Sequence, residues 1–521
     1  MKGRMRLAIK KSNMNIVIVG LLLGIFIAAI DNTIVATAMG TIVGDLGGLD
    51  KFVWVTSAYM VAEMAGMPIF GKLSDMFGRK RFFVFGILTF LLGSVLCGTA
   101  HSIVELSIYR AIQGIGGGAL VPIAFSILFD IIPMEKRGKM SGIFGAVFGL
   151  SSIFGPLLGA YITDYISWHW IFYINLPLGL LAFVLVAFFY KESLQHAKQK
   201  IDWWGSLTLV SSIVALMFAI ELGGNKYAWD SFTILGLFAA FFVLLITFLI
   251  IETKVEEPII SFNMFKYRLF AGSTLVALFS GAAFVVAVVF IPLYIQGVFG
   301  GTATNSGLVL LPMMVSSVIT AMIGGMIMNK FSYRNIMLTS LILLVLGIIL
   351  LTTLTPTTSR FVVTIYMIIT GLGIGASFSV LSNAVIHHFD TVQRGSANAT
   401  FAFVRSLGMT IGITIFGIIQ RNIFTSQMSE AFAGQGNTPE SIGDPRELLS
   451  QAGRAQIPAS TLDKITAALS SSIAQTFAWA IIPAGLGFLF VLYMSNERLL
   501  TASHDSQAAN KDLKNTALIQ G

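Results

Sequence analysis

Long apolar runs recur along the whole chain of 521 residues, and short charged patches separate them. Each run holds about 18–25 residues, the length at which an α-helix crosses a hydrocarbon core of about 30 Å. Only 11% of the residues are charged, whereas a soluble domain carries about 25%. The alternating segments of about 10 residues that are typical of a membrane β-barrel are not visible. The sequence therefore predicts an all-α polytopic membrane protein.

Fourteen runs are predicted to span the membrane. They lie near residues 15–40, 52–71, 82–100, 103–127, 140–163, 168–190, 204–222, 231–252, 270–297, 304–329, 335–354, 361–384, 396–419 and 473–494. The first run is too long for the hydrophobic part of a signal peptide and ends without a cleavage site, so we interpret it as an uncleaved span. An even number of spans places both termini on one side of the membrane.

The distribution of basic residues predicts which side that is. With a cytoplasmic N-terminus, 24 lysines and arginines fall in inner segments and seven fall in outer loops. Inner loops are the ones enriched in basic residues, so we expect both termini to be cytoplasmic. Because the net charge of +8 is spread over these loops rather than gathered on one face, we do not expect a nucleic-acid partner. The single cysteine excludes an internal disulfide.

We predict two six-helix halves with an insertion between them. The predicted parts are a cytoplasmic N-terminus 1–14, an N-terminal bundle 15–190, two inserted helices 191–255, a C-terminal bundle 256–500 with a long extracellular loop near 420–472, and a cytoplasmic tail 501–521. The basic turn at 71–81 has a weaker copy at 324–334, in the matching place of the second half. Such repeats are typical of secondary transporters, whose substrate site lies at the midplane.

Ionisable residues inside predicted spans are costly, and each one is a functional candidate. Asp31 and Glu63 are candidates for proton coupling, because burial disfavours the charge of a carboxylate and a nearby arginine such as Arg110 restores it. Simpler roles stay open: a helix-packing hydrogen bond for Asp31, a direct contact of Glu63 with a cationic substrate, and a structural counter-ion for Arg110.

Four residues are candidates for lining a substrate cavity: Glu63, Gln113, Asn398 and Arg405. Arg405 lies near the middle of its predicted span, about 11 residues from Arg394. The sequence does not separate substrate contact from helix packing for this arginine.

No motif predicts a cofactor, a metal or a catalytic centre. The glycines at 114, 116, 117 and 118 lie inside a span, which favours close helix packing over a phosphate loop. The adjacent His387 and His388 point in different directions on a helix, and no other residues show the spacing of metal ligands. We therefore expect a protein that is not an enzyme, that needs no cofactor or ATP, and that uses the proton gradient.

The fifth predicted span combines small residues with a proline. Gly142, Ser151, Gly155, Pro156 and Gly159 share it. Small residues allow close helix contact, and a proline removes a helix hydrogen bond. We interpret this span as a bendable gate, with a simple kink as the alternative.

The basic turn GKLSDMFGRKR contains one acidic residue, Asp75. A carboxylate is stabilised at the positive N-terminus of a helix, and the thirteenth span begins near Arg394. Asp75 is therefore predicted to act as a cytoplasmic latch that holds the two halves together when the protein opens outward. The alternative is that the turn only anchors the topology.

These motifs resemble those of the major facilitator superfamily. GKLSDMFGRKR resembles its loop signature between helices 2 and 3, YRAIQGIGGGAL its helix-4 arginine motif, and GLSSIFGPLLGA its helix-5 exporter motif. AIDNTIVATAMG, SWHWIFYINLPLG and IDWWG resemble segments of the fourteen-helix drug:proton antiporter branch. The first-helix motif departs from that branch at Met39 and Gly40, His169 stands where an arginine is common, and Ser151 replaces a usual glycine.

The resemblance implies a fold, a cytoplasmic gate and an activity. The implied gate consists of Gly71, Asp75, Gly78, Arg79 and Asp130. The implied activity is proton-coupled export of amphipathic, hydrophobic and often cationic compounds by alternating access. We expect a monomer in the plasma membrane of a bacterium, with protons, small molecules and the lipid bilayer as partners. The alternatives are a lipid or glycolipid translocase on the same fold, and a membrane receptor or assembly factor that does not transport.

Overall fold

The computed structural model describes residues 13–47, 53–192, 202–224, 227–300, 303–390, 393–432 and 458–499. The predicted N-terminal segment up to residue 12, the tail 501–521 and the middle of the predicted external loop lie outside these ranges. Helices dominate the described residues, and no β-strand occurs among them. The all-α class is therefore confirmed.

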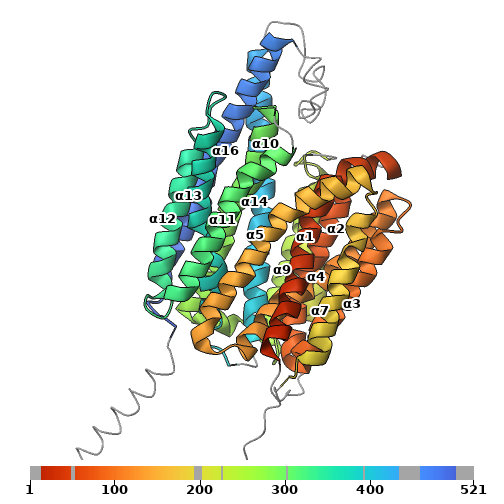
Figure 1. Ribbon diagram of the computed structural model, residues 1–521, viewed down its shortest axis with the longest axis vertical. Coiled ribbons are helices and arrows are strands. Elements are labelled where there is room, and N and C mark those ends of the chain that lie inside the picture. The colour runs from red at the N-terminus through yellow and green to blue at the C-terminus, as the bar shows by residue number, and fades with distance from the viewer. Residues whose placement is uncertain are drawn as a thin grey trace, which may run out of the picture. The chain divides into compact units, whose positions relative to one another are not determined.

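The helices follow one another along the chain (Figure 1). They are α1 (Met14–Leu46), α2 (Val53–Phe77), α3 (Arg79–Cys97), α4 (Ile103–Ile131), α5 (Met134–Tyr165), α6 (Trp170–Tyr173), α7 (Asn175–Phe189), α8 (Trp203–Leu222), α9 (Phe232–Lys254), the 3-10 helix η1 (Phe262–Lys266), α10 (Arg268–Gly297), α11 (Ala303–Ile327), α12 (Tyr333–Leu351), α13 (Arg360–Ala384), α14 (Arg394–Ala431) and α16 (Ala459–Tyr493).

Every predicted span coincides with a helix, and the sixth coincides with the pair α6 and α7. Among the described residues, twelve helical segments are long and apolar enough to cross a membrane. The helices α2 and α5 are not among these twelve, and both carry several charged residues. The predicted total of fourteen spans therefore stays a prediction.

The helices on both sides of the predicted external loop are longer than we expected. Residues up to Ala431 continue α14, and α16 starts at Ala459, so both ends of the region 420–472 are helical. Polar contacts join the two extensions: Gln420 Nε2 donates to Ser472 Oγ at 3.1 Å, and Gln427 Nε2 donates to Ser471 Oγ at 2.9 Å. These hydrogen bonds between α14 and α16 stabilise both helices beyond the length that a bilayer requires. Hydropathy alone does not predict such an extension.

The described helices form two compact units. Unit 1 comprises the described residues of Met1–Ile131, Phe154–Met264 and Phe389–Phe403, and unit 2 comprises those of Ile132–Ile153, Phe265–His388 and Val404–Gly521. In unit 1, α4 packs against α2 and α3, α1 against α7, and α8 against α9. In unit 2, α13 packs against α11 and α12, and α16 against α10 and α12. The unit boundaries run through α5 and α14, so the division into two bundles and an insertion remains a prediction.

The second half of α5 packs closely against α1 within unit 1. A Cβ atom added at Gly155 would lie 1.9 Å from Thr33 Oγ1, and one added at Gly159 would lie 2.2 Å from Thr37 Oγ1. Pro156 lies inside the same helix, and Ser151 donates to the Val147 carbonyl at 2.8 Å. The predicted close packing is therefore confirmed at both glycines. The side-chain environment of Gly142 lies outside what the structure describes.

We expect Gly155→Ala to destabilise the protein, because its added methyl group overlaps Thr33. Overpacking of a filled interior costs about 1–3 kcal/mol. The measurement is the thermal unfolding transition of purified protein in detergent. Gly236→Ala in α9 is the matched control, since nothing lies within 4 Å of its added Cβ atom. Equal transition temperatures for the two variants would contradict the close contact.

Candidate functional site

Asp31 lies at the centre of a fully buried polar cluster, which we call the Asp31 cluster. Its carboxylate forms an ion pair with Arg110 and accepts hydrogen bonds from Gln113 Nε2 at 2.8 Å and Asn175 Nδ2 at 3.1 Å. Each of these four residues has 0% of its surface exposed. A buried charge is stable only when it is paired and its remaining lone pairs accept hydrogen bonds. The cluster meets this requirement with side chains from α1, α4 and α7.

Arg110 is held on several sides. Its Nε donates to the Val55 carbonyl at 3.2 Å, Nη1 donates to Gln113 Oε1 at 2.7 Å, and the guanidinium lies 4.1 Å from the centre of the Tyr59 ring. Such a cation–π contact is favourable when both groups are shielded from water. The Nη2 atom is buried and has no hydrogen-bond partner among the described residues. Much of the charge compensation of Arg110 therefore depends on Asp31.

Small residues bring the helices of the cluster together. Arg110 and Gln113 are three residues apart and share one face of α4. On the next turns, a Cβ atom at Gly114 would lie 2.4 Å from the Tyr59 carbonyl, and one at Gly118 would lie 2.5 Å from the Glu63 carbonyl. The predicted role of these glycines in helix packing is confirmed.

Glu63 lies beside this cluster. The Asn32 side chain is hydrogen-bonded to its carboxylate, and both Asp31 and Arg110 are near enough to act on it electrostatically. The structure therefore brings together the three residues that we predicted for proton coupling. The three residues thus place one permanent positive charge beside two carboxylates.

The predicted cavity residues Asn398 and Arg405 belong to different units. Asn398 lies in unit 1, is 2% exposed, and donates from Nδ2 to the Pro122 carbonyl at 3.0 Å. Arg405 lies in unit 2, where its guanidinium carbon is 5.3 Å from the centre of the Phe378 ring. Gln113 belongs to the Asp31 cluster. A shared cavity for these residues and Glu63 stays a prediction.

Asp75 binds the N-terminal end of α14, and both lie within unit 1. Its Oδ1 accepts from the Gly395 amide at 3.1 Å, and its Oδ2 accepts from the Ser396 amide at 2.6 Å. Two amides of a helix N-terminus and a carboxylate form a favourable electrostatic pair. The helix-capping contact that we predicted for Asp75 is therefore present.

Arg79 extends this contact to α4. Its guanidinium forms an ion pair with Asp130, donates to the Ser126 carbonyl at 2.9 Å, and donates to Asp75 Oδ1 at 3.1 Å. We call Asp75, Arg79, Asp130 and the Gly395 and Ser396 amides the latch. A Cβ atom at Gly71 would lie 2.1 Å from Ala399 Cβ, so only glycine permits this approach. Gly78 adopts a φ of 112°, which favours glycine at the turn between α2 and α3.

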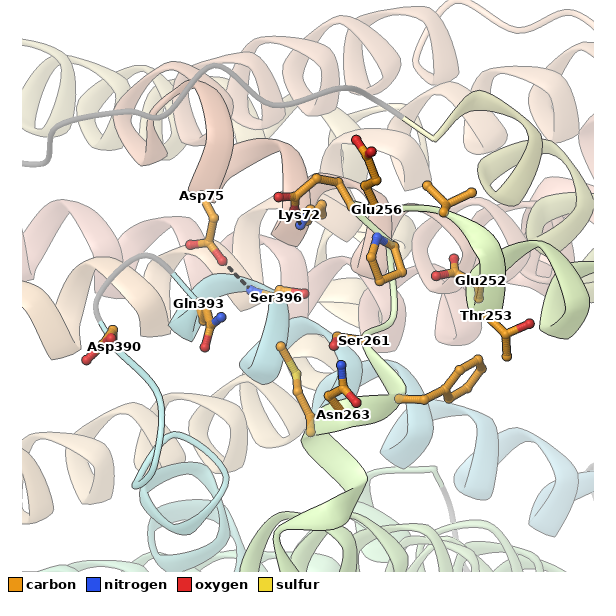
Figure 2. Close-up of a pocket in the computed structure, with 15 residues that line it drawn as sticks. Lys72, Asp75, Glu252, Thr253, Glu256, Ser261, Asn263, Asp390, Gln393 and Ser396 are labelled. Atoms are coloured by element: carbon orange, nitrogen blue, oxygen red, sulfur yellow. Dashed lines mark hydrogen bonds and ion pairs between the residues drawn. The ribbon is translucent and has the colours of Figure 1, made fainter.

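A polar cavity of about 580 Å³ opens beside the latch (Figure 2). Its lining includes Lys72 and Asp75 from α2, Glu252 from α9, Ser396 from α14, and part of the segment 255–261 that follows α9. We call residues 255–261 the strap. Lys72 Nζ lies 2.7 Å from Glu257 Oε2 on the strap, and Ser396 Oγ donates to the Ile259 carbonyl at 3.3 Å. The strap is thus joined to both α2 and α14.

Sequence reasoning missed several of these residues. Ser94 is fully buried and accepts from Gln113 Nε2 at 2.8 Å and Asn175 Nδ2 at 3.2 Å. A polar residue inside an apolar run was the only available signal for Ser94 and Asn175. Nothing in the sequence pattern pointed to the strap contacts of Lys72.

His387 and His388 in unit 2 share one acidic partner. Their Nε2 atoms lie 3.3 Å and 2.8 Å from Glu497 Oε2. Burial lowers the pKa of His387, while the Glu497 carboxylate opposes this effect. The described residues contain no group of three or more side chains that can hold a metal ion. The pair therefore connects the end of α13 to the segment after α16.

Comparison with known proteins places these features in a family. The model of the Major Facilitator Superfamily matches residues 21–413. Multidrug resistance protein 3 of Bacillus subtilis strain 168 is 54% identical over 506 residues, which cover 96% of this chain and 99% of that protein. Multidrug transporter protein MdtP of the same strain is 35% identical over 521 residues, which cover 96% of each.

A solved structure shows the same fold. The proton:xylose symporter XylE matches with a TM-score of 0.61 over 94% of this chain and 98% of that chain, at 13% sequence identity. At this identity the similarity concerns the fold alone. Together with the matched family model and the relatives, it shows that the chain belongs to the major facilitator superfamily, a family of membrane transporters rather than enzymes.

Proposed function

We propose that this protein is a proton-coupled exporter of amphipathic, hydrophobic and often cationic compounds, in the fourteen-helix branch of its superfamily. Protonation of the Asp31 and Glu63 set favours one facing state, and binding of substrate favours the other. Alternating access requires only that each ligand binds the two states with different affinity. The proton gradient then supplies the energy, and no cofactor takes part.

The buried pair of Asp31 and Arg110 is the observation that supports this proposal most strongly. An ion pair with 0% exposure inside apolar helices is costly to maintain. Such a pair is useful when one partner changes its protonation, because the loss of one charge changes the stability of the whole arrangement. Glu63 beside it supplies a second carboxylate that responds to the same charges.

The names of the relatives support the proposed substrate class, since both are described as multidrug proteins. The 22 methionines and 42 phenylalanines of this chain provide adaptable apolar surface, which suits ligands of varied shape. We further propose a monomer in a bacterial plasma membrane, with both termini in the cytoplasm, as the distribution of basic residues predicts.

Purified protein in liposomes tests this function. With a pH gradient and a pH-sensitive dye, we expect a lipophilic cation to drive proton movement in proteoliposomes but not in protein-free liposomes. A protonophore should abolish the signal, since it removes the gradient. Transport of a labelled lipid without proton movement would support a lipid translocase instead. The absence of both signals across a panel of cationic and neutral dyes would contradict a transport function of either kind.

A further inference from the structure

The helices α8 and α9 bring two buried carboxylates together at one end of their pairing. Asp202 precedes α8 and Glu252 lies in the last turn of α9. A Cβ atom at Gly205 would lie 2.2 Å from Asp202 Oδ2 and 3.1 Å from Glu252 Oε1, so both carboxylates face the same point. Asp202 is 7% exposed and Glu252 is 3% exposed. The absence of a side chain at position 205 leaves room for them.

Each carboxylate has one oxygen with a donor and one without. Asp202 Oδ1 accepts from the Gly205 amide at 2.8 Å, and Glu252 Oε1 accepts from the Ile259 amide at 3.2 Å, while the Ile260 amide also acts on the Glu252 carboxylate. Asp202 Oδ2 and Glu252 Oε2 are buried and have no hydrogen-bond partner among the described residues. An ionised carboxylate can only accept hydrogen bonds, so two of them cannot satisfy each other.

The surrounding charges do not neutralise this pair. Lys72 on α2 is the cation that acts on Glu252, and its ammonium is 2.7 Å from Glu257 on the strap. The other charged groups that line the neighbouring cavity are acidic: Asp75, Glu256 and Asp390. Figure 2 draws Glu252 on α9 among these lining residues. Among the described residues, the cation near the pair is thus engaged by Glu257, and the other charged groups of the lining carry negative charge.

We infer that Asp202 and Glu252 jointly bind one proton and form a second proton-binding site, separate from the Asp31 cluster. The proton comes from water, bonds to one orphaned oxygen, and leaves the pair with a single negative charge. Two like charges in one buried site are disfavoured, and sharing a proton removes that repulsion. The protonated acid then supplies the hydrogen-bond donor that the described side chains lack.

Backbone and side-chain bonds connect this site to the latch. Glu252 accepts from the Ile259 amide, the Ile259 carbonyl accepts from Ser396 Oγ, and the Ser396 amide donates to Asp75. Every member of this series lies in unit 1. Loss of the proton places two negative charges at the start of the series, and their repulsion shifts Glu252 relative to Asp202, which changes its hydrogen bond to the Ile259 amide of the strap. The two helices between the predicted halves would thus regulate the latch, and this last step rests on the proposed function.

Infrared difference spectroscopy of the purified protein tests the proton site itself. Between acidic and alkaline buffer, we expect a carbonyl band of a protonated carboxylic acid that is lost in Glu252→Gln and also in Asp202→Asn. Glu256→Gln is the matched control, because Glu256 lines the same cavity but is exposed. Asp31→Asn should keep the band, which separates it from the Asp31 cluster.

Several outcomes would overturn the inference. One is a band that persists in both single variants. Another is a parent protein that shows no such band and instead binds an added amine or sodium ion at Glu252. If one variant does not accumulate, the other tests the same pair from the opposite side. The spectrum does not depend on transport, so a failed transport assay with a normal band contradicts the proposed function alone. If Glu252→Gln transports at the parent rate and with the pH profile of the parent protein, the connection between this site and the latch is contradicted.

Discussion

Asp31→Asn is expected to abolish substrate-driven proton movement in proteoliposomes. An asparagine cannot take up a proton, and its amide cannot balance the charge of Arg110. Breaking a buried ion pair by removing one partner costs about 3–5 kcal/mol, because Arg110 stays fully buried without the carboxylate that pairs with its Nη1. We therefore expect a lower unfolding temperature together with a signal equal to that of protein-free liposomes.

Two further variants separate the loss of coupling from the loss of stability. Asp31→Asn combined with Arg110→Gln removes both charges, which should restore most of the unfolding temperature but not the proton signal. Asp45→Asn is the matched control on α1, where the carboxylate is exposed and accepts from Trp168 Nε1 at 2.8 Å. This control should transport like the parent. Proton movement at the parent rate in Asp31→Asn would show that Asp31 only packs helices.

Asp75→Asn is expected to open the latch. Asparagine presents one acceptor oxygen, whereas Asp75 receives the amides of Gly395 and Ser396 on two oxygens and Arg79 on one of them. A hydrogen bond that involves a charged group contributes about 1.5–3 kcal/mol, which corresponds to a population change of about tenfold to a hundredfold. Hydrogen exchange of a peptide that covers the start of α14 should therefore be faster by about that factor.

The same variant distinguishes a latch from a topology anchor. Arg79, Lys80 and Arg81 remain, so a reporter fused to the N-terminus should show unchanged orientation while the transport rate falls. Arg81→Gln is the control, because Arg81 is exposed in the same basic stretch. It removes a positive charge and should leave the exchange rate unchanged. Inverted orientation in Asp75→Asn, with unchanged exchange at Gly395 and Ser396, would indicate that the turn only anchors the topology.

The sequence by itself determined the helical class and the apolar centre of each long helix, but not how far α14 and α16 extend. Hydrophobic length is a local property, because about 20 apolar residues are needed to cross a bilayer wherever they occur. It also made Asp31, Glu63, Arg110 and Asp75 candidates for functional roles, since a charge inside or next to an apolar run has an evident cost. The family followed from short motifs that carry these residues.

Only the tertiary structure decided which residues meet. Ser94 and Asn175 join the Asp31 cluster because of the rotation of α3 and α7, which no local pattern specifies. Asp75 and Ser396 are 321 residues apart in the chain, and Lys72 and Glu257 are 185 apart. Asp202 and Glu252 likewise meet at Gly205 only after α8 and α9 have packed. Such pairings depend on the packing of whole helices, so their chemistry exists only in the folded protein.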